Sequence, residues 1–302
     1  MGYLYAIAAV LSAAIKGFCG KRTSDLTDTP EKASGFSAIR ALLCVPCALA
    51  AVLIATGGLS ALSMPLELLP ICAVGGAAWG FLTVSWLFAV RGGAFMLVAA
   101  VEGVGVFIPV LLSALFFPET ESLGIWKVVG LIIMIAAAIV MNSYSKQLKG
   151  KTSPLTWLAA IISSLCNAIN EFSQKWFNRA SGGGTDSSVY VFYTYVFALL
   201  VVLIFFAISK SVQPKSVSPN KPPKGRLVLF AFLMAICTLF YTLSSTAAAG
   251  LLPSSVLFPL KQGLAMIVNV AMSAIFFKER VKPSEIVGVA LAFCAMILIN
   301  LF

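Results

Sequence analysis

Ten apolar runs, each long enough to cross a membrane as a helix, follow one another along the chain with short polar connections. A spanning helix needs about 20 apolar residues to cross a hydrocarbon core of about 30 Å. Because backbone N–H and C=O groups find no water there, such runs fold as helices, in which these groups form hydrogen bonds with one another. We place the spans at residues 2–20, 36–56, 67–90, 94–117, 124–142, 155–176, 188–209, 227–249, 254–277 and 283–302.

The composition agrees with a membrane protein. Of the 302 residues, 60% are hydrophobic and 11% are charged, and the mean hydropathy is +0.99. Soluble domains are about 45–50% apolar and about 25% charged. We therefore predict an all-α integral membrane protein with ten transmembrane helices.

A residue type and a motif that many enzymes and pumps depend on are missing from the chain. It contains no histidine, the commonest general base and metal ligand, and no GxxxxGK[ST] loop for nucleotide binding. Its seven cysteines lie in or beside apolar runs, and Cys44 and Cys47 form a CxxC without a second ligand pair. We expect a carrier that is not an enzyme and has neither a metal nor a cofactor.

The chain also contains an internal repeat. The segment SALFFPE (113–119) aligns with SAIFFKE (273–279), with five identities in seven positions, and further matches keep the same helix order. We therefore divide the chain into residues 1–150 and 151–302, each with five helices. Because five is odd, the second half enters the membrane from the opposite side, which predicts inverted repeats and alternating access.

Basic residues in the loops predict the orientation. Fifteen Lys and Arg residues fall in loops on one side of the predicted spans and three, Lys127, Lys175 and Arg179, on the other. Cytoplasmic loops carry the excess of positive charge. We expect a multi-pass protein of the cytoplasmic membrane with both termini outside the cytoplasm. The net charge of +10 is then a topology signal and a contact with lipid headgroups, with no role in nucleic-acid binding.

These features resemble the ten-helix, EamA-type branch of the drug/metabolite transporter superfamily. The resemblance covers the whole chain and rests on the duplication and on the SALFFPE and SAIFFKE motifs, each followed by a glycine-containing helix. It implies a basket of ten helices around a cavity lined mainly by the third, fourth, eighth and ninth. It also implies a gating role for Pro109 in the fourth helix, although the aligned position of the second half is Asn269.

Two charged residues stand out near the middle of the membrane. Glu102 lies eight residues into the fourth predicted helix and Lys261 seven into the ninth. A charged side chain at that depth costs at least about 2.5–3.5 kcal/mol, so each requires a reason. In the repeat alignment Glu102 faces Gln262, beside Lys261. We expect Glu102, Lys261 and Gln262 to bind substrate, while an ion pair that only joins two helices is the structural alternative.

A polar stripe on the sixth predicted helix is a second candidate surface. Asn167, Glu171 and Gln174 share one helical face, although Lys175 could pair with Glu171. Lys16 in the first helix is either a substrate ligand or a side chain that snorkels to the interface. Arg40 is interpreted as a snorkelling anchor.

Aromatic residues provide further candidates for the cavity wall. Trp79 lies in mid-membrane, away from the interfacial belt, and Tyr241 lies in the eighth predicted helix. Both are included among the expected substrate-binding residues, with aromatic filling of the bundle as the alternative. The spacing of Gly76 and Gly80 predicts close helix packing.

The sequence thus predicts a secondary carrier for a small polar organic metabolite, with protons as the coupling ion at Glu102. A substrate with both charges, such as an amino acid, fits an acid and a base best, and a lone anion held by Lys261 is second. A flippase for a lipid-linked or amphipathic substrate and a quaternary-amine carrier remain alternatives, and the latter would use an aromatic cage.

Overall fold

The computed structural model describes residues 1–23, 30–91, 101–118, 124–143, 154–212, 224–276 and 283–301. In these ranges all the regular elements are helices. They are α1 (Gly2–Thr23), α2 (Pro30–Thr56), the short 3₁₀ turns η2 (Leu59–Leu62) and η3 (Leu66–Leu68), α3 (Leu69–Arg91), α5 (Phe107–Phe116), α6 (Ile125–Ser143), α7 (Pro154–Ser181), α8 (Ser187–Val212), α9 (Lys224–Leu251), α10 (Ser254–Phe276) and α11 (Pro283–Leu301).

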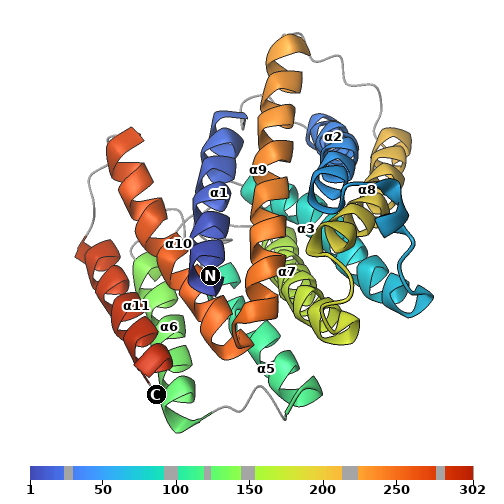
Figure 1. The fold of residues 1–302 in the computed structure, drawn as a ribbon. Coiled ribbons are helices and arrows are strands. Elements are labelled where there is room, and N and C mark those ends of the chain that lie inside the picture. The colour runs from blue at the N-terminus through green and yellow to red at the C-terminus, as the bar shows by residue number, and fades with distance from the viewer. Residues whose placement is uncertain are drawn as a thin grey trace.

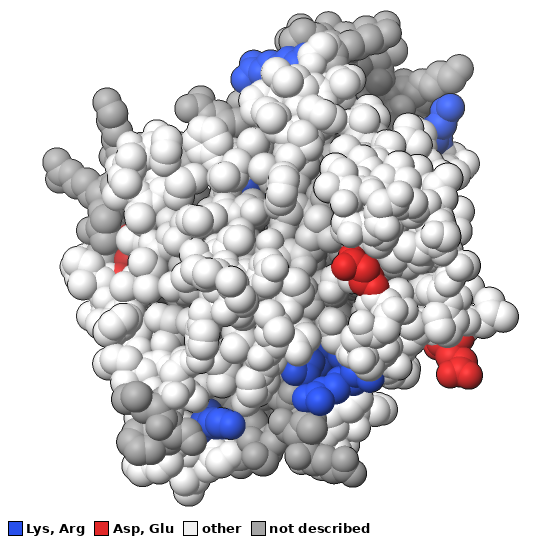
Figure 2. Space-filling view, viewed as in Figure 1, with Lys and Arg blue, Asp and Glu red and all other residues white. Residues whose placement is uncertain are grey.

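The predicted membrane class is confirmed. Within the described part of the chain, eight helices are long and apolar enough to cross a bilayer, and Val101–Phe116 and Ile125–Val140 are shorter apolar helices. Large apolar side chains point outward, among them Ile54 (86% exposed) and Leu115 (73%). Figure 2 shows a mostly uncharged face, with basic side chains toward its upper and lower edges and a few acidic ones on its right-hand side. Such a surface is suited to lipid and not to water.

Prolines define several helix boundaries. Pro30, Pro154 and Pro283 are each the first residue of a helix, where the missing N–H costs nothing. Pro109 has a different effect, because its ring clashes with the carbonyl four residues earlier. The predicted fourth helix is helical over 101–105, turns at Val106 and resumes as α5. Residues 94–100 of that predicted span lie outside the described residues.

Two hydrophobic clusters join the helices. In Figure 1, α1 and α9 run through the middle of the view, and α10 slants from the upper left to the lower middle beside α6 and α11. The helices α2, α3, α7 and α8 lie to the right. The first cluster includes Leu131, Met134 and Leu257 from α6 and α10. The second includes Trp79 and Tyr195 from α3 and α8. The polar residues discussed below lie on helices from both clusters.

Glycines let some of these helices approach closely. A Cβ at Gly76 would meet Thr194 O at 2.5 Å and one at Gly80 would meet Val201 Cβ at 2.8 Å, both on α8. The predicted packing role of this GxxxG spacing is therefore confirmed for the α3–α8 contact.

Equivalent helices of the two halves make equivalent contacts with the opposite half. The α1–α9 contact corresponds to α7–α3, α1–α10 to α7–α5, and α2–α9 to α8–α3, when the first helix of one half is matched to the first of the other. Figure 1 shows the α6–α11 pair beside α10. Each half therefore packs mainly against the other.

Both termini lie at one end of the bundle. The Tyr3 hydroxyl donates a hydrogen bond to Asn300 Oδ1 at 3.0 Å, and Gly2 packs against Leu252. We call this the terminus end, and the other, where α1 finishes at Thr23 and α10 at Phe276, the far end. The side of the membrane that each end faces stays a prediction.

Candidate functional site

A buried polar network lies between α7, α9 and α10. The Lys261 ammonium pairs with Glu171 Oε1 at 2.7 Å and donates a hydrogen bond to Ser245 Oγ at 2.8 Å. Ser245 in turn donates to Gln174 Oε1 at 2.7 Å, and the Tyr241 hydroxyl donates to Glu171 Oε1 at 3.3 Å. Lys261 is only 5% exposed and Glu171 7%. The two charges neutralise each other away from water.

The network continues to α3. Gln174 Nε2 donates to Asn170 Oδ1 at 3.1 Å, and Asn170 Nδ2 donates to the Gly75 carbonyl at 3.0 Å. A Cβ at Gly75 would lie 2.5 Å from both Ser173 Oγ and the Tyr190 hydroxyl, so the close contact with α7 needs glycine. We call Asn170, Glu171, Gln174, Tyr241, Ser245 and Lys261 the closed network.

A second set of charges lies toward the far end. Glu102 is half-buried and accepts one hydrogen bond, from Ser163 Oγ at 3.2 Å. Lys16 Nζ lies 4.9 Å from the centre of the Tyr241 ring. Arg40 is 7% exposed, donates to Thr83 Oγ1 at 3.0 Å and lies 5.3 Å from the Trp79 ring. We call Lys16, Arg40 and Glu102 the open cluster.

Tyr241 separates the two sets. Lys261 lies 5.0 Å from the centre of the same ring that Lys16 approaches. Lys261 is seven residues from the start of α10, at the terminus end, and Lys16 is seven residues from the end of α1, at the far end. At about 1.5 Å per residue each is about 10 Å inside the bundle, from opposite ends. The ring therefore lies between two levels of polar residues.

The structure changes three sequence-based interpretations of charge. The expected charged centre joined Glu102 to Lys261, but Lys261 pairs with Glu171. Arg40 was interpreted as a snorkelling anchor, and this is wrong, because its guanidinium is buried against Trp79 and Thr83. The suggested Lys175 pairing with Glu171 is also replaced, since Lys175 Nζ donates to the Leu252 carbonyl at 2.7 Å.

The remaining candidates are placed as follows. Asn167 is half-buried on α7, one turn from both Ser163 and Glu171. Gln262 lies against Gly103, where a Cβ would meet its Nε2 at 3.2 Å. Trp79 is buried and packs on Tyr195 with ring centres 5.3 Å apart. The buried Pro109 follows the interruption at Val106, while the Asn269 side chain lies outside the described residues.

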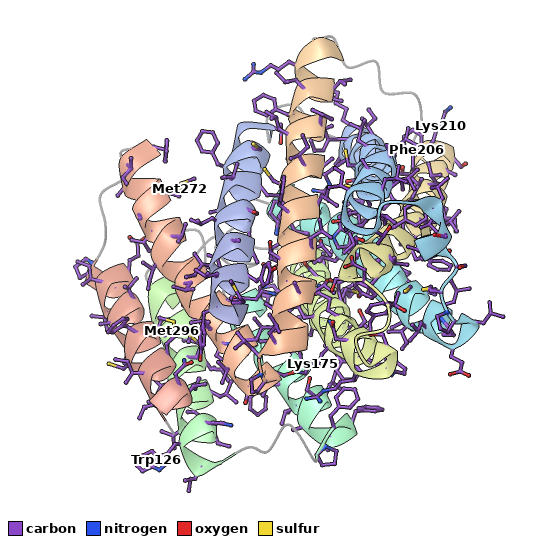
Figure 3. All side chains as sticks on the ribbon, in the orientation of Figure 1. Trp126, Lys175, Phe206, Lys210, Met272 and Met296 are labelled. Atoms are coloured by element: carbon purple, nitrogen blue, oxygen red, sulfur yellow. The ribbon has the colours of Figure 1, made fainter. Side chains whose placement is uncertain are left out.

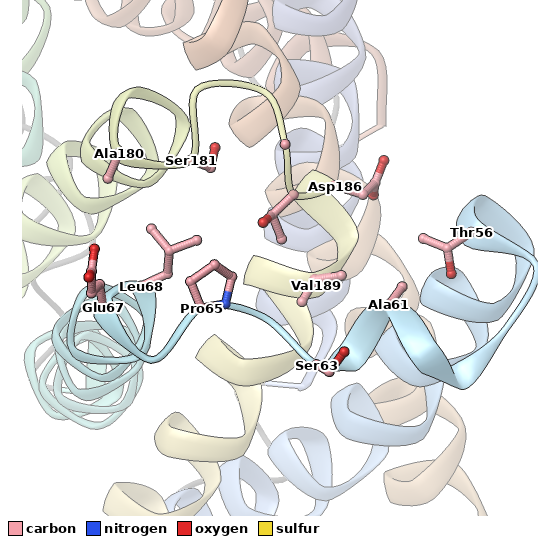
Figure 4. A pocket seen from close by; sticks show the side chains of 12 residues that line it. Thr56, Ala61, Ser63, Pro65, Glu67, Leu68, Ala180, Ser181, Asp186 and Val189 are labelled. Atoms are coloured by element: carbon pink, nitrogen blue, oxygen red, sulfur yellow. The ribbon is translucent and has the colours of Figure 1, made fainter.

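A separate cavity opens at the terminus end. It has a volume of about 480 Å³ and lies between the α2–α3 connection and the α7–α8 turn, with Thr56, Ser63, Glu67, Ser181 and Asp186 in its wall (Figure 4). In Figure 3, Lys175 lies in the half of the bundle toward this end and Lys210 at the far end of α8. None of the predicted substrate-binding residues lines this cavity.

Comparison with known proteins identifies the chain's family. The model of the EamA-like transporter family matches residues 154–301. This match places residues 154–301, the C-terminal half of the chain, in the drug/metabolite transporter superfamily. A crystal structure of another protein is similar over 99% of this chain and 97% of that one, with a TM-score of 0.72 and 18% identity, which extends the likeness of fold to the N-terminal half. No curated protein matches the chain. The protein is therefore a membrane transporter.

Proposed function

We propose that this transporter is a secondary carrier for a small polar organic metabolite, an amino acid or related zwitterion. The observation that supports this is a group of ionisable side chains on the membrane-spanning helices that lie inside the apolar bundle. Those in the two polar regions are Lys16, Arg40, Glu102, Glu171 and Lys261. Each costs at least about 2.5–3.5 kcal/mol to keep in a membrane, and intramembrane charges mark substrate and ion pathways.

Alternating access between two inverted halves is the proposed mechanism. The exchange of partners between the helices of residues 1–150 and 151–302 supports such a symmetry, because inverted repeats related by a pseudo-twofold axis give the same contacts twice. The break at Val106 before Pro109 supports a hinge in the fourth helix, since a proline removes one backbone hydrogen bond there.

Glu102 is the proposed proton-coupling residue and the ligand for a substrate ammonium group. It is half-buried and accepts a single hydrogen bond, from Ser163, so its carboxylate keeps acceptor capacity for a proton or an amine. Asn167 and Gln262, both half-buried near it, supply further polar contacts. Glu171 is a weaker candidate for proton coupling because Lys261 already neutralises it.

The proposed function is tested with purified wild-type protein in two steps. Thermal stability is measured with amino acids, phosphorylated and nucleotide-linked sugars, and quaternary amines, because a ligand that binds only the folded state raises it. The stabilising compounds are then tested for exchange and for pH-gradient-driven uptake in lipid vesicles. We expect an amino acid to stabilise the protein and to exchange.

Two outcomes contradict the proposal. Stabilisation by quaternary amines alone favours the amine carrier. Stabilisation by lipids alone, with no exchange of any water-soluble compound, favours the flippase.

A further inference from the structure

We infer that Lys16 and Arg40 together bind the carboxylate of the transported molecule, on the far-end side of Tyr241. This rests on the proposed function and names the charged group that the substrate must carry. The sequence assigned an anion to Lys261, but the Glu171 carboxylate already occupies that ammonium.

Arg40 is a buried cation that has no counter-ion among the described residues. Its side chain is 7% exposed, and its polar contact is to the neutral Thr83 hydroxyl. Its Nε has no hydrogen-bond partner, and no carboxylate among the described residues forms an ion pair with it. A buried charge is costly unless it is paired and hydrogen-bonded. A guanidinium with a free N–H can therefore donate a hydrogen bond to a carboxylate oxygen.

Lys16 adds a second cation that forms no ion pair within the part of the chain that the structure describes. Its ammonium lies within electrostatic range of Arg40, Glu102 and Lys261. The ammonium lies over the face of the Tyr241 ring. Two cations that repel inside an apolar bundle are stabilised by an anion between them.

A single carboxylate can neutralise and hydrogen-bond both the Lys16 ammonium and the Arg40 guanidinium. Its two oxygens can accept hydrogen bonds from the guanidinium and the ammonium at once. Lys16 on α1 and Arg40 on α2 lie above the Tyr241 and Trp79 rings respectively, so α9 and α3 form the walls. Glu102 also lies within electrostatic range of Lys16. A substrate whose carboxylate binds Lys16 and Arg40 can therefore place its ammonium group near Glu102.

The first arm of the test uses the wild-type protein and three probes. The amino acid that gives the largest thermal stabilisation is compared with its α-amide, which lacks the carboxylate, and with its des-amino acid, which retains it. We expect the α-amide to bind roughly tenfold to a hundredfold more weakly than the amino acid, the effect of losing charged hydrogen bonds. We expect the des-amino acid to bind more tightly than the α-amide. An α-amide that binds as tightly as the amino acid overturns the inference.

The second arm uses Lys16→Gln and Arg40→Gln, with Lys175→Gln as the matched control. Lys175 is also a buried lysine, but its ammonium contacts the Leu252 carbonyl at the terminus end. We expect both cluster variants to lose affinity for the amino acid by roughly tenfold or more while the control keeps it. Arg40→Lys, which keeps the charge, is expected to retain part of the affinity and serves if Arg40→Gln does not fold.

Binding and exchange by the wild-type protein distinguish failure of this inference from failure of the proposed function. If wild-type protein neither binds nor exchanges any amino acid, the proposed function fails. If the wild type exchanges an amino acid and both cluster variants bind it with unchanged affinity, the proposed function stands and this inference is overturned.

Discussion

The two polar regions on either side of Tyr241 differ in how completely their charges are satisfied. In the closed network the Lys261 ammonium has Glu171, Ser245 and a ring face, and each buried amide in the chain of contacts has a partner. In the open cluster, Arg40 Nε has no hydrogen-bond partner among the described residues, and the Lys16 ammonium lies over an aromatic ring. Glu102 accepts one hydrogen bond. A satisfied network holds helices in place, whereas an unsatisfied one is prepared for a ligand.

The largest expected effect is on stability when the closed network loses its cation. Lys261→Ala leaves the Glu171 carboxylate buried and unpaired, which costs about 3–5 kcal/mol of unfolding free energy. Replacing both charges with neutral residues of similar volume, as in the double variant Lys261→Met with Glu171→Gln, recovers most of that loss. The measurement is thermal or chemical unfolding in one detergent. Equal stability of the single variant and the wild type would falsify the structural role of the pair.

Two matched serine variants sharpen the comparison. Ser245→Ala removes a buried hydroxyl that links Lys261 to Gln174, so it leaves buried polar groups without a partner and costs about 1–3 kcal/mol. Ser163→Ala removes the one donor to the half-buried Glu102 and costs less than about 1 kcal/mol, because the carboxylate is not fully buried. The measurement is the unfolding free energy of both variants. A greater loss for Ser163→Ala reverses the assignment of the two regions.

Glu102→Gln is expected to change transport more than stability. The substitution keeps the size of the side chain and the contact with Ser163, so unfolding free energy changes by less than about 1 kcal/mol. Uptake driven by a pH gradient is lost, because an amide does not take up a proton, while exchange of substrate across the vesicle membrane continues. Proton coupling that survives in this variant contradicts the role of Glu102.

The sequence predicted the helices well and the contacts between charges poorly. Apart from the start of the fourth span, which lies outside the described residues, hydropathy places the span ends within six residues of the helix ends, because the bilayer fixes the length of an apolar helix. It does not fix the rotation of a helix about its axis. The repeat alignment put Glu102 and Lys261 at nearly equivalent positions, but equivalence under a pseudo-twofold axis is not contact. Lys261 instead meets Glu171, which had been assigned to a separate polar stripe.

Arg40 shows the same limit at a single residue. Its depth, about three turns after the start of α2, is compatible with snorkelling or with an inward rotamer. The inward rotamer requires the Trp79 ring and the Thr83 hydroxyl, both on α3. Only the packing of α2 near α3 brings them together. The available signal was a mid-membrane tryptophan within reach of an arginine on a neighbouring helix.

The smallest expected effect comes from removing a charge of the open cluster in the ligand-free protein. Lys16→Gln removes a cation that forms no ion pair among the described residues, so the unfolding free energy changes by less than about 1 kcal/mol. Lys210→Gln, an exposed lysine at the far end of α8, is the control and leaves stability unchanged. The measurement is the melting temperature of both variants without added substrate. A loss of about 1 kcal/mol or more in Lys16→Gln indicates a stabilising partner for Lys16 and removes the distinction between the two regions. A neutral or positive change, together with weaker substrate binding, is typical of binding sites, where stability is given up for function.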